Sequence, residues 1–438
     1  ASLPDYGNFL SFGYKEKTLS LDKVEHDHET IYSQSILMND VPKNFRPEPY
    51  AYHQELTLHV EGLTNLGLGV ARDDGWVVLV PFALPDEIVR LRIYRNHKNY
   101  SDADLIEVIT PSPDRVEPRC QLFGSCGGCQ YQHLAYEKQL AWKQQHVRDA
   151  FSRIAGVEAD VLPVRPSSKS YGYRSKLTPH FQKGPEGIGE IGFLMQGRRR
   201  AIVDVENCPI ATDSINERLP EARDQLRQTW KGKRGGTLLL REVIEGVVSD
   251  PEEIVTERVG ESTFQFKAGE FFQNNPFVLP LLVEHVVQQS KTDEISLLVD
   301  AYCGGGLFGL SAASRFKKIV GIEISREGFE GARTNARINQ IENSQFFLGD
   351  ASSIFDELEG ISEPAALVID PPRRGCDPDF LRQAIEFAPQ RIVYVSCEPA
   401  TQARDCQILL KAGYQPILAQ PFDLFPQTRH VENVLTLV

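Results

Sequence analysis

Hydrophobic and polar residues alternate in several short runs in the first third of the chain. Leu56, Leu58 and Val60 are separated by single polar residues, and similar runs follow. A period of two is typical of a β-strand with one buried face. Four or five such strands within about sixty residues predict a small closed β-barrel of the oligonucleotide-binding (OB) type over residues 54–112. Residues 1–53 are polar and irregular, and we expect a loosely held extension there.

The pattern becomes mixed in residues 113–265. Residues 136–154 carry apolar positions at helical spacing with Gly156 just beyond, which predicts a helix. The stretches 171–181 and 188–205 predict antiparallel strands. We therefore expect a central α+β domain.

Strand-like and helix-like segments alternate in residues 266–438. Short apolar runs, typical of buried strands, lie at residues 295–300, 319–323, 345–348, 365–369 and 391–396. A helical segment is expected at 327–339. Alternation of this kind predicts an α/β domain with a doubly wound, mostly parallel sheet, which binds its ligands at the carboxyl ends of the strands.

Composition narrows the class of protein. A chain of 438 residues exceeds one ordinary core, and its 41% hydrophobic and 24% charged residues are those of a globular protein. The net charge of −13 argues against coating nucleic acid by bulk electrostatics. No apolar run reaches the ~18 residues of a membrane span, so we expect a cytoplasmic monomer without membrane contact.

Local basic and aromatic residues still allow RNA contact. Arg90, Arg92 and Arg95 interleave with Tyr94 and Tyr100. Cations among aromatic rings suit stacking on unpaired bases beside phosphate contacts. Composition alone favours the alternative, an exposed strand face with buried tyrosines.

A glycine loop follows the first strand of the last domain. Gly304, Gly306 and Gly309 are spaced as in a dinucleotide-binding loop, and Glu323 ends the next strand, where an acid can accept from ribose hydroxyls. Enzymes that use S-adenosylmethionine carry a similar loop and acid. The loop by itself leaves a nicotinamide cofactor and S-adenosylmethionine open.

The cysteines of the central domain are spaced like metal ligands. Cys120, Cys126 and Cys129 form a C-x5-C-G-G-C group, and Cys208 can supply a fourth thiolate. Four thiolates hold either zinc or an iron-sulfur cluster. The spacing does not choose between the two.

A thiol and two carboxylates define the candidate chemistry. Cys397 follows an apolar strand, Asp370 precedes two prolines after another strand, and Glu432 opens the last strand-like segment. Carbon 5 of uracil becomes nucleophilic when a thiolate adds to carbon 6, and a base must then remove the hydrogen at carbon 5. Cys397 and Glu432 suit these two tasks.

Taken together, these motifs resemble the RNA uracil-C5 methyltransferases, most closely the branch that acts on 23S ribosomal RNA. The resemblance runs from about residue 54 to the end of the sequence. Its residues are Cys120-x5-Cys126-Gly127-Gly128-Cys129, Phe271-Phe272-Gln273-Asn274-Asn275, Tyr302-Cys303-Gly304-x-Gly306, Asp370-Pro371-Pro372-Arg373, Val395-Ser396-Cys397-x-Pro399-x-Thr401 and His430-Val431-Glu432.

The resemblance implies a fold and a set of site residues. The barrel would be a TRAM domain, the central domain would hold a 4Fe-4S cluster, and the last domain would be a class I methyltransferase with a seven-stranded sheet. Cys397 would be the nucleophile and Glu432 the proton acceptor. The cluster ligands would be Cys120, Cys126, Cys129 and Cys208. The S-adenosylmethionine and uridine sites would include Gln273, Tyr302, Gly304, Gly306, Glu323, Asp350 and Asp370.

The expected function is therefore methylation of carbon 5 of a uridine in structured RNA. We favour ribosomal RNA, because the barrel and cluster domain resemble the ribosomal branch more than the shorter transfer-RNA branch. The alternatives are a transfer-RNA enzyme, an RNA-binding or folding factor with secondary catalysis, and a nicotinamide-dependent oxidoreductase.

Overall fold

The computed structural model describes residues 41–198, 200–358 and 363–438. The chain divides into two compact units, which are Ala1–Pro113 with Leu194–Ala201, and Asp114–Phe193 with Ile202–Val438. Residues 1–40 of the expected extension lie outside the described part.

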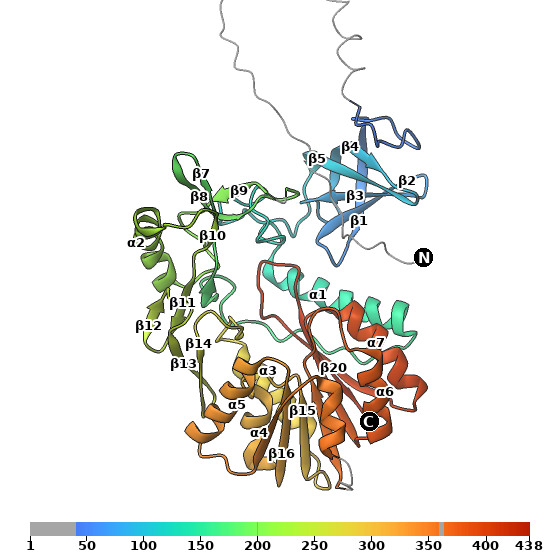
Figure 1. The fold of residues 1–438 in the computed structure, drawn as a ribbon. Coiled ribbons are helices and arrows are strands. Elements are labelled where there is room, and N and C mark those ends of the chain that lie inside the picture. The colour runs from blue at the N-terminus through green and yellow to red at the C-terminus, as the bar shows by residue number, and fades with distance from the viewer. Residues whose placement is uncertain (1–40, 199, 359–362) are drawn as a thin grey trace, which may run out of the picture. The chain divides into compact units, whose positions relative to one another are not determined.

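The first unit contains a closed five-stranded barrel (Figure 1). Its strands are β1 (Glu55–Leu63), β2 (Leu68–Asp73), β3 (Trp76–Pro81), β4 (Ile88–Asn96) and β5 (Tyr100–Thr110). They close in the order β1-β2-β3-β5-β4. Val60, Val78 and Leu91 point inward and are fully buried. The alternating pattern had predicted this barrel, and the prediction is confirmed.

The arginines of the barrel are paired on its surface. Arg90 lies 3.2 Å from Glu55 and 3.0 Å from Glu107, and Arg92 lies 3.2 Å from Asp104. All these side chains are exposed, so the ion pairs add little stability. The geometry fits the exposed strand face that composition favoured, but not the buried tyrosines expected with it, because Tyr94 is 37% exposed and Tyr100 is half-buried.

The second unit begins with a helix and several small sheets. Helix α1 (Tyr136–Ala150) runs into a π-helical turn, η1 (Phe151–Ala155), close to the predicted bounds. Helix α2 (Asp213–Thr229) and three small sheets complete this part of the unit. The strands are β6 (Lys176–Leu177), β7 (His180–Gly184), β8 (Gly187–Leu194), β9 (Ile202–Asp204), β10 (Gly236–Thr237), β11 (Leu240–Val243), β12 (Gly246–Val248), β13 (Ile254–Val259) and β14 (Ser262–Lys267).

The two long strands predicted here are each interrupted. Pro179 separates β6 from β7, because proline has no backbone N–H for a sheet ladder. Gly197, at φ +71, lies between β8 and β9, and this positive φ marks a turn. A single proline or glycine can therefore interrupt a strand that the alternating pattern predicts to be continuous.

A seven-stranded sheet forms the rest of the second unit. Its strands are β15 (Leu297–Ala301), β16 (Lys318–Glu323), β17 (Ser344–Leu348), β18 (Ala365–Ile369), β19 (Arg391–Ser396), β20 (Pro416–Phe422) and β21 (Glu432–Leu437), in the order β17-β16-β15-β18-β19-β21-β20. All neighbours are parallel except β21, which runs antiparallel to both β19 and β20. This confirms a doubly wound, mostly parallel sheet.

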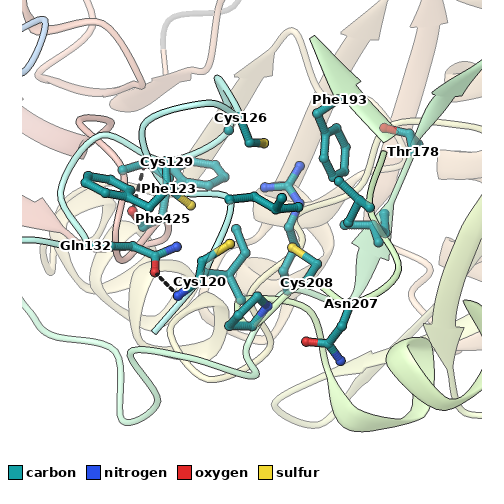
Figure 2. Close-up of a pocket in the computed structure, with 18 of the residues that line it drawn as sticks. Cys120, Phe123, Cys126, Cys129, Gln132, Thr178, Phe193, Asn207, Cys208 and Phe425 are labelled. Carbon is teal, nitrogen blue, oxygen red and sulfur yellow. Dashed lines mark hydrogen bonds between the residues drawn. The ribbon is translucent and has the colours of Figure 1, made fainter. Parts of the chain in front are cut away.

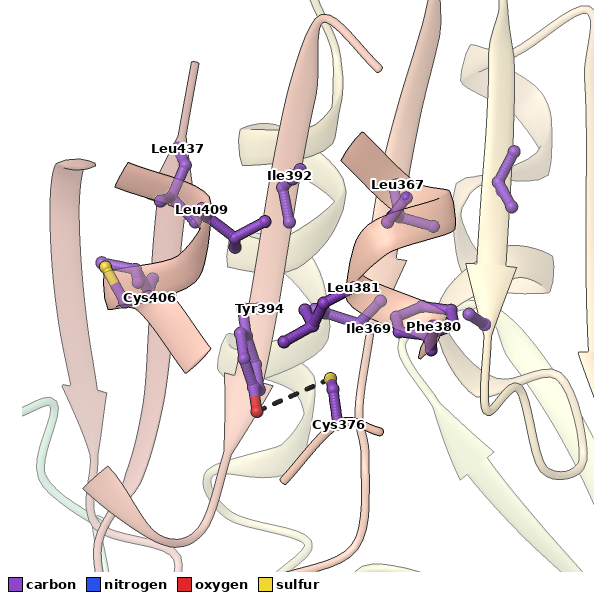
Figure 3. Close-up of a cluster of buried hydrophobic side chains, with 14 of the residues drawn as sticks. Leu367, Ile369, Cys376, Phe380, Leu381, Ile392, Tyr394, Cys406, Leu409 and Leu437 are labelled. Atoms are coloured by element: carbon purple, nitrogen blue, oxygen red, sulfur yellow. Dashed lines mark hydrogen bonds between the residues drawn. The ribbon is translucent and has the colours of Figure 1, made fainter. Parts of the chain in front are cut away.

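Helices cover both faces of this sheet (Figure 1). They are α3 (Leu279–Ser290), α4 (Leu307–Ala312), η2 (Ala313–Arg315), α5 (Arg326–Ile338), η3 (Ala351–Leu358), α6 (Pro378–Phe387) and α7 (Pro399–Lys411). Residues of α1, α6 and α7 share one core cluster with Leu297 and Val299 of β15, part of which Figure 3 shows. Residues of α3, α4 and α5 share the other with Leu298. Alternate side chains of a strand point to opposite faces, which explains the division.

The strand order reverses beside β15. The chain passes from β15 to β16 and β17 on one side, and then to β18 on the other. A reversal of this kind opens a crevice at the carboxyl ends of the strands. Tyr302, Asp370 and Cys397 directly follow β15, β18 and β19 and therefore lie at that end. Among the described residues, no helix has the length and apolarity needed to span a membrane.

Candidate active site

The register of two antiparallel strands brings the candidate thiol and base together. Ser396, the last residue of β19, pairs with Asn433 of β21. Cys397 therefore lies beside Glu432 at the same end of the sheet. Glu432 is 3% exposed, whereas Cys397 is half-buried. A reacting thiol can thus be reached while its neighbouring carboxyl group is shielded from water.

Arg373 is the cation at this thiol. Burial raises the pKa of Cys397 to about 11, and the Glu432 carboxylate adds to the rise. Arg373 opposes both effects through its charge and a hydrogen bond to the sulfur. Because the thiolate is the nucleophilic form, Arg373 favours the reactive state.

Two carboxyl groups interact here, of which Glu432 is buried and Asp370 is half-buried. Burial raises the pKa of Asp370 to about 7. Burial, followed by the charge of Asp370, raises the pKa of Glu432 well above its ordinary value, and Arg373 again opposes the shift. Since two adjacent carboxylates resist ionising together, the pair keeps a proton up to about neutral pH.

Helix α7 fixes the strands that carry these groups. The Gln402 Nε2 group donates to the carbonyls of Tyr394 (2.8 Å) and Asn433 (3.2 Å), and Gln402 Oε1 accepts from Asn433 Nδ2 at 2.7 Å. Both Gln402 and Asn433 are fully buried. The side chain of Gln402 therefore bridges β19 and β21 close to Cys397 and Glu432.

The same helix also holds the loop after Asp370. The Thr401 hydroxyl lies 3.1 Å from the Arg373 carbonyl and 3.0 Å from the Glu398 carbonyl. Asp405 Oδ2 accepts from the Tyr394 hydroxyl and the Cys376 N–H, both at 2.8 Å. Figure 3 shows Tyr394 and Cys376 facing each other. Loop and strand are thus joined through one buried carboxylate.

The glycine loop has the backbone of a cofactor site. Tyr302, Gly304 and Gly306 adopt φ values of +65, +53 and +86. A positive φ at a tyrosine is strained, and such strain clusters at functional sites. Asp300 is fully buried behind the loop and accepts from Gly309 N at 2.8 Å. This contact ties the start of α4 to β15.

Two further predicted residues lie near this loop, where Glu323 ends β16 and Asp350 follows β17 by two residues. Glu323 Oε2 accepts from Gly304 N and its Oε1 from Ser325 N, both at 2.8 Å. Asp350 is exposed, and its Oδ1 accepts from the backbone and the hydroxyl of Ser352. Both carboxylates lie at the ligand-binding end of the sheet, and both also cap loops.

The Phe271–Gln273 segment presents one aromatic ring to solvent. Phe271 is 78% exposed, while Gln273 is 9% exposed. Phe272 stacks on Phe266 with ring centroids 4.5 Å apart, which anchors the segment. The backbone before it is held by Lys176, which donates to the Glu270 carbonyl at 2.9 Å.

The four predicted metal-ligand cysteines line one cavity of about 330 Å³ (Figure 2). Burial raises the pKa of Cys129 to about 12 and that of Cys208 to about 11. Charge interactions with Cys120, Cys126 and Cys208 add to the rise at Cys129. The sequence-distant Cys208 thus reaches the loop of the other three.

The cavity is not a closed coordination sphere. Across the described ranges 41–198, 200–358 and 363–438, no group of three or more His, Cys, Asp or Glu side chains is arranged to hold a metal ion. The cavity lining contains Arg174 and Arg373 but no carboxylate. The structure therefore shows thiols gathered around a cationic cavity and does not show a cluster.

The structure brings most predicted residues together at two places. Cys397, Glu432 and Asp370 interact electrostatically, and the four cysteines share a cavity. Sequence reasoning missed the contact between Arg373 and the thiol and the bridging role of Gln402. A glutamine on the buried face of a helix was the available signal for the second.

Comparison with known proteins identifies the family. A family model described as tRNA (Uracil-5-)-methyltransferase matches residues 252–438, and a TRAM domain model matches residues 53–106. The tRNA (uracil(54)-C(5))-methyltransferase of Schizosaccharomyces pombe is 40% identical over 417 residues, covering 89% of this chain and 79% of that protein. The chain belongs to the RNA uracil-C5 methyltransferase family.

Two other members of the RNA uracil-C5 methyltransferase family are similar over most of the chain. The tRNA (uracil(54)-C(5))-methyltransferase of Saccharomyces cerevisiae is 32% identical, covering 96% of this chain and 78% of that protein. The crystal structure of Pyrococcus abyssi tRNA (uracil-54, C5)-methyltransferase with S-adenosyl-L-homocysteine has a TM-score of 0.66 at 25% identity, covering 87% of this chain and all of that one.

Membership of the RNA uracil-C5 methyltransferase family settles the reaction class. The chain is an S-adenosylmethionine-dependent RNA uracil-C5 methyltransferase with a TRAM barrel, and its substrate is RNA. S-adenosylmethionine is thereby favoured over a nicotinamide cofactor.

Proposed function

We propose that this enzyme methylates carbon 5 of a uridine in transfer RNA, at the position equivalent to residue 54. The observation that carries the proposal is the similarity to fungal enzymes of that name, over 89% and 96% of the chain. It supports the transfer-RNA alternative over the ribosomal RNA that the sequence motifs favoured. The Pyrococcus abyssi enzyme of known structure is named for the same position, which also supports the proposal.

Mapping of 5-methyluridine tests the RNA class. Transfer RNA and ribosomal RNA from cells with and without the gene are compared at single-nucleotide resolution. We expect loss of 5-methyluridine at position 54 of transfer RNA and restoration by the wild-type gene, but not by Cys397→Ser. Loss confined to ribosomal RNA would overturn the proposal.

The proposed reaction assigns three steps to two side chains. The Cys397 thiolate forms a bond to carbon 6, which leaves negative charge on carbon 5 and the carbonyl oxygen. Carbon 5 then takes the methyl group as S-adenosylhomocysteine leaves with the sulfur electron pair. Glu432 removes the carbon 5 proton, and the freed electrons restore the ring double bond as the thiolate departs. Arg373 stabilises the thiolate before attack and after release.

RNA containing 5-fluorouridine tests these assignments. Fluorine cannot leave as a proton, so wild-type enzyme should form a stable covalent adduct. Cys397→Ser should form none. Glu432→Gln should accumulate an adduct on natural uridine, because only the last step needs the base. A Glu432→Gln variant with normal turnover would refute the assignment of the base.

The proposed methyl-donor site follows the crevice beside β15. Tyr302, Gly304 and Gly306 shape its backbone, and Glu323 and Asp350 offer carboxylates at adjacent strand ends. Asp370 and Gln273 complete the proposed S-adenosylmethionine and uridine sites. S-adenosylmethionine carries a sulfonium cation, which half-buried Asp370 can stabilise when ionised.

Phe271 is the proposed RNA-stacking residue of this region. A phenylalanine 78% exposed beside a buried glutamine offers a ring face to an unpaired base. Base flipping leaves a gap in the RNA stack that such a ring can fill.

We also propose that Cys120, Cys126, Cys129 and Cys208 hold a 4Fe-4S cluster. The donor set supports the proposal, because all four thiols line one cavity whose charged side chains are Arg174 and Arg373, although the thiols of the described residues are not arranged as a metal site. Cations compensate the negative charge of a thiolate-bound cluster. When bound, the cluster would cross-link four points of the chain.

Anaerobic purification should give about four iron atoms per chain, and Cys208→Ala should lower that number. Stoichiometric zinc would overturn the proposal.

A further inference from the structure

Residues 423–431 connect β20 to β21 and lead the chain into Glu432. We name them the C-terminal connector. Asp423, Leu424 and Gln427 of the connector are buried although it contains no helix or strand. Gln427 has φ +68, a left-handed conformation that side chains other than glycine rarely adopt. Contacts from elsewhere must therefore impose this shape.

The loop of the candidate cluster cysteines supplies backbone contacts. The Gln427 carbonyl accepts from Gln130 N at 3.1 Å and from Tyr131 N at 3.0 Å. These two residues directly follow Cys129. Gln130 Oε1 also accepts from Arg429 N at 3.3 Å, and Gln130 Nε2 donates to the Gly127 carbonyl at 2.9 Å. The cysteine loop and the connector thus share one hydrogen-bond network.

Helix α1 supplies side-chain contacts. Gln139 Oε1 accepts from Gln427 N, and Gln139 Nε2 donates to Gln427 Oε1, both at 3.0 Å. Gln139 is 1% exposed. This reciprocal pair satisfies a buried backbone N–H beside the positive φ, which would otherwise remain without a partner.

One turn further along α1, Lys143 holds the start of the connector. Its Nζ donates to Asp423 Oδ1 at 2.6 Å and to the Phe425 carbonyl at 3.1 Å. Both Lys143 and Asp423 are fully buried, so separating them would leave a charge unpaired in the interior. Residues four apart lie on the same face of a helix, and this face therefore fixes two points of the connector.

The connector also forms one wall of the cysteine cavity. Phe425, Thr428 and His430 line the cavity, and Glu432 lies two residues beyond His430. The same short segment thus borders the candidate cluster site and delivers the proposed base. A shift of the connector would change both places at once.

We propose that Gln139, together with the loop after Cys129, is a positioning device that sets Glu432 for proton removal. The proposal rests on the proposed role of Glu432 as the base. The cysteine loop would then contribute to catalysis, because it binds the C-terminal connector and the connector leads into Glu432. Attack by Cys397, which directly follows β19 and is held by α7, depends on this device only through the charge of Glu432.

Separating the two chemical steps tests the proposal. Gln139→Leu is compared with Gln144→Leu, a matched control on the same helix whose glutamine donates to the Val161 carbonyl instead. Adduct formation with 5-fluorouridine transfer RNA measures attack. Adduct accumulated on unmodified transfer RNA with S-adenosylmethionine measures slow elimination. We expect Gln139→Leu to slow elimination about tenfold, with attack within about twofold of wild type and unchanged iron and zinc content.

A second variant guards against misfolding. Gln427→Gly removes the side-chain half of the pair but accommodates the φ of +68. It should show the same split between attack and elimination, at smaller size. Equal slowing of both steps, or no slowing of either, in Gln427→Gly and in any folded Gln139→Leu protein would overturn the proposal. Failure of Glu432→Gln to accumulate an adduct would instead refute the proposed base.

Discussion

At the scale of single residues, the balance of charges around Cys397 decides how reactive the thiol is. Burial, Glu432 and Asp370 raise the pKa of Cys397, which reaches about 11. Arg373 acts in the opposite direction and lowers it. The unliganded enzyme therefore holds only a small fraction of thiolate at neutral pH.

Arg373→Gln should slow alkylation of Cys397. Loss of one hydrogen-bonded cation is expected to raise the thiol pKa by about one unit, which reduces the thiolate tenfold. Iodoacetamide labelling of Cys397, followed by peptide mass spectrometry between pH 7 and 10, measures the effect. Arg374→Gln is the matched control, because Arg374 is not among the main causes of the shift in the Cys397 pKa. Equal rates in both variants would contradict the assigned role of Arg373.

The paired carboxyl groups predict the pH dependence of elimination. Both pKa values are raised, that of Asp370 to about 7, so the proton-accepting form increases as the pH rises through neutral. At pH 6 we expect the preformed covalent RNA intermediate to decay slowly, and at pH 8 to decay faster. Denaturing gels that follow its decay after a pH jump measure this rate. A decay rate that is constant from pH 6 to 8 would exclude the carboxyl pair as the titrating group.

At this scale the sequence predicted which residues belong to the candidate site, but not which neighbours their side chains contact. Cys397 and Glu432 were predicted because their motifs carry them. The contact of Arg373 with the thiol was not, because a side chain in a loop has no periodicity to indicate where it points. The same limit applies to Glu323 and Asp350, whose loop-capping contacts depend on backbone N–H groups that only the fold brings near.

At the scale of elements, helix α7 is the scaffold of the candidate site. Its first two turns present Thr401, Gln402 and Asp405 to the loop after Asp370 and to strands β19 and β21. A helix is well suited to hold neighbouring segments, because its backbone groups are already hydrogen-bonded to one another and its side chains are free to bind the neighbours.

Gln402→Leu should destabilise the second unit. The change leaves Asn433 and two backbone carbonyls without their buried partners, which costs about 2–4 kcal/mol in the free energy of unfolding. Urea unfolding followed by tryptophan fluorescence measures this. Gln407→Leu, an exposed position on the same helix, should change stability by less than about 0.5 kcal/mol. A similar loss in both variants would argue against the bridge.

The sequence predicted the elements of the sheet well and their pairing less well. Buried parallel strands are continuous apolar runs, so β15, β16, β18 and β19 were located within a residue or two. The antiparallel insertion of β21 between β19 and β20 was not predicted, because register depends on contacts between strands distant in the chain. That register is what places Glu432 beside Cys397.

At the scale of the whole molecule, the ionisation of two aspartates links the thermal stability of the enzyme to binding of S-adenosylmethionine. Burial raises the pKa values of Asp300 and Asp370 to about 7, above the value of about 4 expected in the unfolded chain. Groups with raised pKa values stabilise the fold when protonated, so this contribution is lost as the pH rises through 7. The ligand-free enzyme should therefore melt at a lower temperature at pH 8 than at pH 6.

S-adenosylmethionine should oppose this loss. Its sulfonium cation favours ionised carboxylates, so the rise in melting temperature that it causes should be larger at pH 8 than at pH 6. S-adenosylhomocysteine, whose sulfur is neutral, is the matched control and should show a weaker pH dependence. Differential scanning fluorimetry measures both. Identical pH dependence for the two ligands would contradict a carboxylate beside the sulfonium.

The insertion of β21 also has a consequence for biosynthesis. A nascent chain that has emerged only as far as Phe422 contains β20 but lacks the strand that joins it to β19. The edges of β19 and β20 that pair with β21 are then both unpaired. Unpaired hydrophobic strand edges favour aggregation or chaperone binding over partial folding. Because that partner begins with Glu432, an incompletely translated chain would also lack the proposed base, and could at most trap RNA on its thiol without releasing it.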